Sequence, residues 1–207
     1  MPIMTTLLER SWQRAWGNLQ LTAPADGLRE RLLAAYGEPG RHYHTLQHLQ
    51  ECLAHLDGAI AGAAHPGEVE LALWFHDAVY DVQDKDNERR SADWAASALA
   101  EHGAAAPVIA RIDGLIMATC HTATPIDPDQ QLLVDIDLAI LGAAPARFAE
   151  YDRQVRAEYA WVPEEIYRVK RREVLQGFLS RASIYSTPAF RDACERQARL
   201  NLHAAIA

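Results

Sequence analysis

An apolar helical run ends in the sequence Trp74-Phe75-His76-Asp77-Ala78-Val79-Tyr80-Asp81, which sets a histidine beside an aspartate. Adjacent residues point to different sides of a helix. Both side chains therefore reach one point only where the helix end is distorted or where that point lies close to the helix axis. Borderline metals such as zinc, manganese and iron accept imidazole and carboxylate ligands together. The stretch predicts a metal site, to which His44, His48, Asp135 and Asp137 are further candidates.

Helical patterns run through the rest of the chain, and no segment shows the period-2 alternation of a half-buried strand. Alanine, which favours helix, is abundant. We expect helices over 43–61, 87–102, 106–119 and about 130–141, and one from Asp26, as the N-cap, to Gly37. Further helices are expected to start at Pro66, Pro145, Pro163 and Pro188, because proline is favoured in the first turn.

The chain has 207 residues, which is enough for one domain with a sizeable core. No linker is long enough to divide it. The pattern predicts a single all-α domain over residues 1–207, packed as a helical bundle, with a core at about 36–142 and C-terminal helices over 145–207 packing on it.

Net charge is −8, which argues against a protein that binds duplex nucleic acid. The charge is uneven: residues 1–146 carry a balance of −11 and residues 147–207 a balance of +3. The acidic part holds the candidate metal ligands, and the basic part offers arginines for anions. Chance and solvated helix faces explain the same asymmetry equally well.

Three scattered cysteines without CxxC spacing indicate reduced thiols. Met1–Arg10 has no apolar run of signal-peptide length, and no run reaches the length of a membrane span. We therefore expect a soluble cytoplasmic protein without membrane attachment. Apolar helix faces leave room for a homodimer.

His44 and His48 are four residues apart and are expected to share one helix face, as two ligands or as one ligand and one acid. Asp135 and Asp137 lie in an otherwise apolar helix, where a buried carboxylate needs compensation. A cation would compensate the carboxylate charge, and so would Arg or Lys partners or the amides of a helix N-terminus. Cys52, one turn from His48, is expected to fill the core.

The order His, His-Asp, Asp on successive helices resembles the HD superfamily of metal-dependent phosphohydrolases. The segment Tyr43-His44-Thr45-Leu46-Gln47-His48-Leu49 is similar to the Tyr-His-Asn-x-x-His-Ala pattern of cyclic nucleotide phosphodiesterases. The resemblance implies that His44 is the proton donor, that His48 is a metal ligand and that His76-Asp77 is the defining doublet. It favours Asp137 over Asp135 as the final ligand.

A longer pattern resembles a bacterial subfamily of predicted HD-type phosphohydrolases and implies an HD-type domain, with matches over roughly residues 36–202. The segments that carry it are Arg41-x-Tyr43-His44, Trp74-Phe75-His76-Asp77-x-x-Tyr80-Asp81, Asn87-Glu88-x-x-Ser91-Ala92, Asp135-Ile136-Asp137-Leu138-Ala139-Ile140-Leu141-Gly142, Arg156-x-Glu158-Tyr159, Ile184-Tyr185 and Glu195-x-x-Ala198-Arg199-x-Asn201-Leu202. The resemblance leaves the substrate open.

Asp81 is the candidate general base, because related guanosine tetraphosphate hydrolases carry an acidic pair at this spacing; here only the second carboxylate of the pair is kept. Capping of a helix near Asn87 is its alternative role. His121 is a candidate ligand of a second metal, as in binuclear members of the superfamily, or a solvent-facing loop residue. Glu88 is a candidate to anchor substrate, or a first-turn acid favoured by the helix dipole.

Phosphate substrates need cationic partners, and arginine binds an oxyanion bidentately. The candidates are Arg41, Arg156, Lys170 and Arg172. Arg41 adjoins the metal-binding segment and is preferred, whereas the last two belong to a basic run that is more typical of a solvated helix face.

The expected function is hydrolysis of a phosphate ester or anhydride in a nucleotide or similar small phosphometabolite. One or two divalent ions are expected (Mn, Fe, Zn, Co or Ni, with Mg also open). A metal lowers the pKa of bound water and polarises a phosphoryl oxygen. Two alternatives stay open: a di-iron oxygenase of HD type, similar to inositol oxygenases, and a non-catalytic module that senses a nucleotide.

Overall fold

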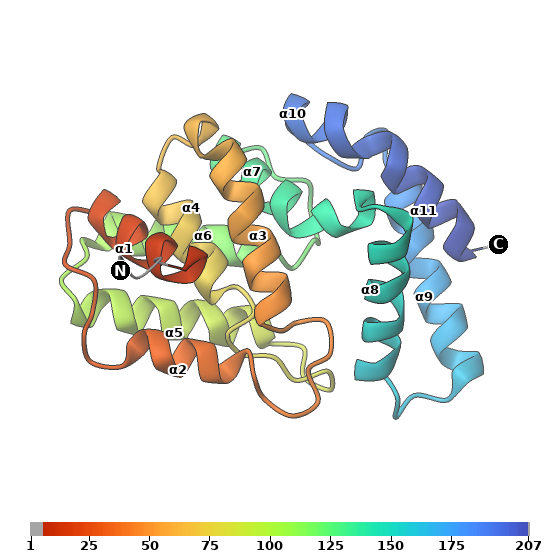
Figure 1. The fold of residues 1–207 in the computed structure, drawn as a ribbon, viewed down its shortest axis with the longest axis horizontal. Coiled ribbons are helices and arrows are strands. Elements are labelled where there is room, and N and C mark those ends of the chain that lie inside the picture. Colours follow the sequence, from red (N-terminus) through yellow and green to blue (C-terminus); the bar gives the residue numbers. More distant parts are fainter. Residues whose placement is uncertain (1–5, 207) are drawn as a thin grey trace, which may run out of the picture.

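The computed structural model describes residues 6–206 and, within that range, consists of helices, turns and loops without a strand. The prediction of an all-α protein is confirmed. Figure 1 shows the helices from α1 to α7 at the left and those from α8 to α11 at the right. The first set is α1 (Leu7–Asn18), α2 (Leu28–Ala35), α3 (Leu46–Ala59), η1 (Ile60–Gly62), α4 (Pro66–Phe75), α5 (Asn87–Glu101), α6 (Ala106–Ala118) and α7 (Pro128–Asp137). The remainder is η2 (Leu138–Gly142), α8 (Pro145–Glu158), α9 (Glu164–Leu179), α10 (Pro188–Phe190), the π-helical η3 (Arg191–Glu195) and α11 (Arg196–Ile206).

Helix α4 is the centre of the first set, because every residue from Gly67 to Phe75 is buried. A helix that is apolar on all sides is expected to lie in a core. Trp74 packs edge-on against Trp12 of α1, with ring centroids 5.0 Å apart, and donates its indole N–H to Ser11 Oγ. The end of α4 is therefore held rigidly where the metal site is expected.

Two glutamates interrupt the apolar surface of α4, and each is paired with an arginine from a neighbouring helix. Glu70 accepts two bonds from Arg14 of α1, and Glu68 accepts two from Arg111 of α6. Buried carboxylates without such partners would be strongly destabilising. The pairs therefore join α4 to α1 and α6 at defined positions along the helix.

Helix boundaries differ from the sequence-based expectation at the candidate site. The helix expected over 43–61 begins only at Leu46, because Thr45 is its N-cap and accepts a bond from the Gln47 amide. His44 thus precedes the helix, and the expected sharing of one helix face with His48 is wrong. The helix expected at 130–141 starts at Pro128 and tightens to a 3-10 helix after Asp137.

Three of the four prolines hold the expected place. Pro66, Pro145 and Pro188 occupy the first turn, whereas Pro163 is the N-cap residue of α9. The N-cap expected at Asp26 is wrong as well, because Gly27 holds that position with φ of 84°; the Asp26 carboxylate still accepts a bond from the Leu28 amide. Asp26 thus lies one residue before the N-cap, and its side chain accepts from the first amide of the helix.

The C-terminal helices contact η2, the short segment that directly follows α7. Asn201 of α11 donates its amide N–H groups to the carbonyls of Leu141 and Ala143, at 2.8 Å each. Gly142 lies against Cys194 of the π-helical segment so closely that a Cβ atom would stand 2.6 Å from the cysteine Cβ and 2.8 Å from its carbonyl oxygen. A glycine is therefore needed for this approach.

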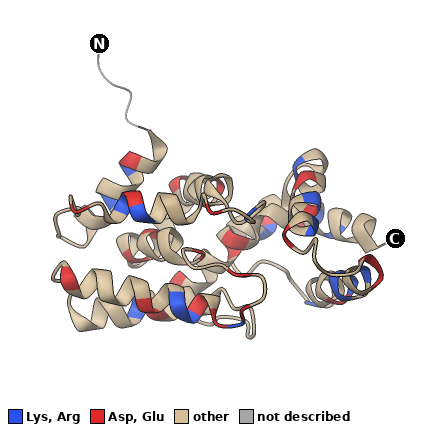
Figure 2. Cartoon of the chain, turned by 90° about the horizontal axis from the view of Figure 1, so that it is seen from below, with Lys and Arg blue, Asp and Glu red and all other residues tan. Residues whose placement is uncertain are grey.

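Charges of both signs lie on most helices, with Lys and Arg recurring along the C-terminal helices at the right of Figure 2. Among the described residues, no helix has the length and apolar character required to cross a membrane. The expectation that Met1–Arg10 carries no signal-peptide run falls partly on residues 1–5, which lie outside the described range.

Candidate metal centre

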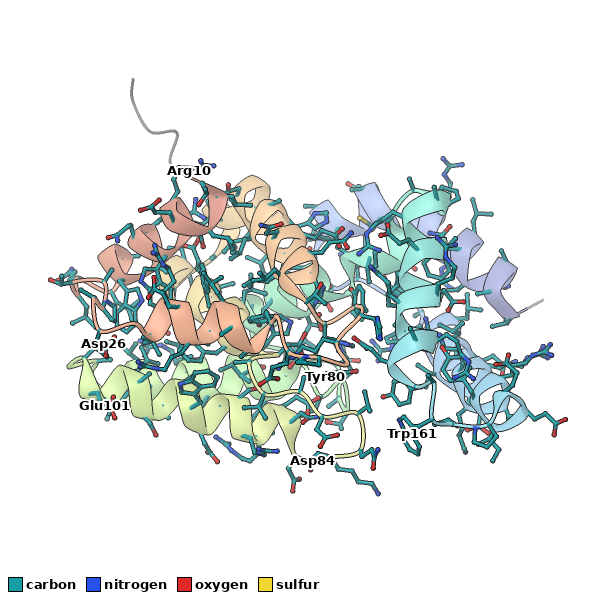
Figure 3. All side chains as sticks on the ribbon, turned by 60° about the horizontal axis from the view of Figure 1, so that its bottom comes forward. Arg10, Asp26, Tyr80, Asp84, Glu101 and Trp161 are labelled. Carbon is teal, nitrogen blue, oxygen red and sulfur yellow. The ribbon has the colours of Figure 1, made fainter. Side chains whose placement is uncertain are left out.

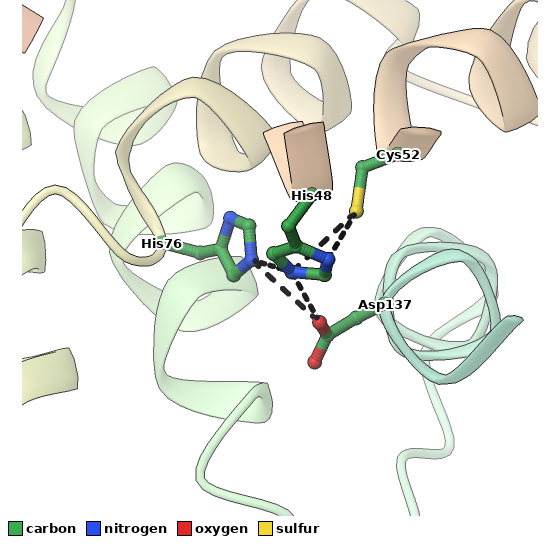
Figure 4. Close-up of side chains that lie close together, drawn as sticks. All are labelled: His48, Cys52, His76 and Asp137. Atoms are coloured by element: carbon green, nitrogen blue, oxygen red, sulfur yellow. Dashed lines mark hydrogen bonds and ion pairs between the residues drawn. The ribbon is translucent and has the colours of Figure 1, made fainter. Parts of the chain in front are cut away.

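Segments far apart in the sequence converge on one buried point. His48 comes from α3, His76 and Asp77 follow directly on α4, and Asp137 is the last residue of α7. Figure 4 shows His48, His76 and Asp137 directed toward one another, with Cys52 beside His48. The structure thus brings together the four residues predicted as metal ligands.

The distances among these donors match the spacing of ligands around a single ion. Nε2 of His48 lies 3.2 Å from Nε2 of His76 and 3.2 Å from Asp137 Oδ1. Asp77 Oδ2 lies 3.0 Å from His76 Nε2 and 3.4 Å from His48 Nε2. Donors bound about 2.0–2.2 Å from one ion, at angles of roughly 90–110°, lie about 2.8–3.6 Å apart. These contacts are therefore short enough for the donors to share one metal ion.

A backbone carbonyl fixes the orientation of His76. Its Nδ1 lies 2.9 Å from the carbonyl oxygen of Leu73, one turn earlier in α4. A carbonyl only accepts hydrogen bonds, so Nδ1 carries a proton, and in the neutral ring the lone pair is on Nε2. This is the arrangement by which proteins orient a metal-binding imidazole.

The end of α4 explains how adjacent residues reach one point. The helix ends at Phe75, and the buried guanidinium of Arg41 donates to the carbonyl oxygens of Asp77 and Ala78 at 2.6 and 3.0 Å. Those carbonyls have no later helical amide to accept from. The doublet therefore lies in the turn that follows the last residue of α4. Arg41 holds this turn in place; its predicted contact with substrate stays a prediction.

The electrostatics of the cluster favour charged carboxylates. Burial raises the pKa of Asp77, but the charge of His76 and hydrogen bonds from both imidazoles outweigh burial and hold the pKa well below its usual range. The pKa of Asp137 is also lowered against the effect of burial, chiefly by the hydrogen bond with His121. Anionic oxygens beside imidazole nitrogens suit a cation between them.

His121 lies on the other side of the Asp137 carboxylate. Its Nε2 is 3.0 Å from Asp137 Oδ2, whereas Oδ1 faces His48 and His76. The His121 backbone has φ of 53°, an uncommon conformation for a residue with a side chain. Its Nδ1 is buried and accepts or donates no hydrogen bond among the described residues. His121 therefore contacts the Asp137 oxygen that does not face His48 and His76.

A second group of side chains surrounds His44, which lies just before α3. Its Nδ1 is 2.8 Å from Glu158 Oε2, and its ring stacks on Tyr80 with centroids 4.1 Å apart. Tyr80 donates its hydroxyl to the same carboxylate oxygen, and Figure 3 labels it close to the end of α8 that carries Glu158. The Glu158 Oε1 atom accepts from the backbone amides of residues 42–44. Nε2 is then the free nitrogen of His44.

Glu158 is a site residue that sequence reasoning missed. Burial raises its pKa, but hydrogen bonds from His44 and from the backbone lower it to about 2. The residue stood only inside the motif Arg156-x-Glu158-Tyr159 and had no assigned role. This motif was therefore the signal for Glu158 in the sequence.

The two remaining aspartates lie apart from the cluster. Asp135 is fully buried and accepts from the amides of Ser186 and Thr187 and from the Thr187 hydroxyl, so Asp137 is the one that meets the imidazoles. Asp81 is exposed because α4 does not continue to it, and its carboxylate accepts from the Gln83 amide. The helix therefore does not extend from Asp77 to Asp81, and the role of Asp81 as general base stays a prediction.

The other predicted anion-binding residues occupy varied places. Arg156 donates to Glu164 and to the carbonyls of Tyr159 and Val162. Lys170 pairs with Glu173, and Arg172 is exposed on α9. Their contact with substrate stays a prediction.

Glu88 is half-buried beside Cys120, where burial and the glutamate charge raise the thiol pKa. It therefore lies next to the segment that carries His121, and its role as a substrate anchor also stays a prediction.

A cavity of about 220 Å³ adjoins the cluster on the side of the C-terminal helices. Its lining includes His48, Asp137, Arg147 and two thiols, Cys52 and Cys194. The donor atoms of His48, Cys52, His76 and Asp137 all lie within 4.8 Å of one another. This buried group could hold a metal ion, and Cys52 is the member that sequence reasoning assigned to the core.

Comparisons with known proteins leave the family open. No protein-family model matches the chain, no curated protein matches it, and no solved structure matches it.

Proposed function

We propose that the protein is a metal-dependent phosphohydrolase of the HD type, acting on a nucleotide or similar small phosphometabolite. One observation supports this above all: Nε2 of His48 and Nε2 of His76 each lie 3.0–3.6 Å from a carboxylate oxygen of Asp77 and of Asp137. The resemblance of the surrounding motifs to HD phosphohydrolases supports the reaction class.

In this proposal His48, His76, Asp77 and Asp137 hold the ion. When bound, a divalent cation supplies Lewis acidity toward a phosphoryl oxygen and lowers the pKa of coordinated water. The carboxylates stay ionised, as their lowered pKa values require, and Arg41 keeps the Asp77 turn in position.

His44 protonates the leaving oxygen from Nε2. The Nδ1–H group of the same ring donates a hydrogen bond to Glu158, which orients the imidazole. The stack on Tyr80 restricts the ring further. Because Asp81 is exposed, we expect it to contribute less to the reaction than its spacing from Asp77 implied.

A second ion is supported by His121. Asp137 offers one oxygen to His48 and His76 and the other to His121, so Asp137 and His121 would be the residues to hold a second ion. A di-iron oxygenase would also hold two ions and would need His44 as a further ligand besides His121. His44 is instead hydrogen-bonded to Glu158. The hydrolase is therefore preferred.

The test is turnover of a broad panel of phosphorylated metabolites by protein loaded separately with Mn²⁺, Zn²⁺, Fe²⁺ and Mg²⁺. Release of phosphate or of a dephosphorylated product is expected from the wild type and absent from His76→Ala and Asp77→Ala. Stabilisation by a nucleotide without turnover would instead point to a sensing module. Equal activity of the variants and the wild type would contradict the proposal.

A further inference from the structure

Cys52 occupies a place that apolar packing alone does not explain. It lies one turn after His48 on α3, so the two side chains share a face of the helix. Its Sγ is 3.7 Å from both ring nitrogens of His48, and its side chain is 2% exposed. The thiol is therefore buried in contact with the imidazole of His48.

The sulfur also lies within reach of the proposed ion. A thiolate bound at about 2.3 Å and an imidazole bound at about 2.0 Å, at angles of roughly 90–110°, put sulfur and nitrogen about 3.1–3.6 Å apart. The observed separation from His48 Nε2 is 3.7 Å. The sulfur is equally far from Nδ1, so it lies beside the ring and has to move toward the ion to bind it; the donor atoms of His48, Cys52, His76 and Asp137 all lie within 4.8 Å of one another.

We infer that Cys52 is an additional, thiolate ligand of the ion held by His48, His76, Asp77 and Asp137. The inference rests on the proposed function and names its cofactor class. On binding, the Sγ–H bond breaks, its proton goes to solvent, and the sulfur forms a bond to the ion.

A thiolate among the donors changes which metals the site prefers. Sulfur ligands favour zinc and other thiophilic transition metals, whereas Mg²⁺ prefers oxygen ligands. Two imidazoles, two carboxylates and one thiolate leave one position of an octahedral set for a substrate oxygen. The site is therefore expected to take Zn²⁺, Co²⁺ or Fe²⁺ and to discriminate against Mg²⁺.

Cobalt reports the bond directly, because a thiolate bound to Co²⁺ gives an intense charge-transfer band in the near ultraviolet. We expect this band in the Co²⁺-loaded wild type and in Cys194→Ser, whose thiol lines the same cavity. Cys52→Ser is expected to bind Co²⁺ without the band and to lose more than about tenfold in Zn²⁺ affinity. The band in Cys52→Ser, or a wild type that binds Co²⁺ without it, would overturn the inference.

Two further readouts separate this inference from the proposed function. X-ray absorption of the Zn²⁺-loaded wild type is expected to show a sulfur neighbour at about 2.3 Å and needs no variant. A shell of nitrogen and oxygen alone overturns the thiolate and leaves the four-ligand site standing. Failure of the wild type to bind any divalent metal more tightly than His76→Ala overturns both.

Discussion

Nδ1 of His44 lies 2.8 Å from Oε2 of Glu158, which joins the loop before α3 to the last residue of α8. The same carboxylate holds three consecutive backbone amides at residues 42–44 through its other oxygen. One buried acid therefore sets both the path of the loop and the orientation of the imidazole.

Glu158→Gln should lower kcat by about 100-fold, the contribution typical of a positioned general acid. The amide oxygen can still accept from the backbone, but the amide nitrogen faces His44 and reverses its tautomer. Steady-state kinetics on the substrate found for the wild type would measure the loss. Tyr80→Phe is the matched control, because it removes the other bond to Oε2 but keeps the aromatic stack. A variant with unchanged kcat and pH profile would show that Glu158 has no part in catalysis.

Stability should fall in acid in a way that depends on Glu158. Its folded pKa of about 2 lies below the usual 4.5, so the ionised form stabilises the fold above pH 4.5. That stabilisation is lost as pH falls toward 2 and amounts to about 3 kcal/mol. Urea unfolding at several pH values would measure it. Glu158→Gln should show a shallower decline between pH 5 and pH 2, and parallel curves would contradict the assignment.

The two aspartates of α7 should separate stability from metal binding. Asp137→Asn removes the charge that faces three imidazoles and should abolish tight metal binding, as elemental analysis after gel filtration would show. Asp135→Asn should keep the metal but turn an amide N–H toward backbone donors, at a cost of about 1–3 kcal/mol. The reverse pattern would mean that Asp135 is the ligand.

Gly142→Ala should destabilise the protein by about 1–3 kcal/mol, because the new methyl group meets backbone as well as side-chain atoms of Cys194. Gly177→Ala on α9 is the matched control, since a Cβ there meets nothing within 4 Å. This second change should be neutral or stabilise by up to about 0.5–1 kcal/mol. Thermal unfolding of both variants would measure the difference, and equal effects would show that η2 and η3 can move apart.

The sequence predicted those parts of the site that local patterns determine. The doublet His76-Asp77 ends an apolar run, and a helix that stops there can direct both side chains to one point. The helices that start at Pro66, Pro145 and Pro188 are likewise predicted by the local sequence, because proline is favoured in the first turn. Asp81 would lie one helical turn beyond Asp77 only if the helix continued, and α4 ends at Phe75.

Contacts between distant parts of the chain were beyond sequence reasoning. Glu158 is 114 positions from His44, and no spacing rule connects them. Arg41 was identified as a cation near the site, but its use by the carbonyls of Asp77 and Ala78 depends on the path of two loops. Cys52 has the correct spacing from His48, yet only the approach of α4 and α7 shows that the thiol faces other donors.

The bond between His44 and Glu158 also bears on the order in which the site matures during synthesis. A ribosome extends the chain from its N-terminus, and early segments begin to fold first. All the candidate metal donors, from His48 to Asp137, leave the ribosome before Glu158 does. A nascent chain would thus hold its metal-binding groups together while His44 still lacks its hydrogen bond to Glu158. The His44 imidazole would be fully oriented only once α8 has emerged and docked.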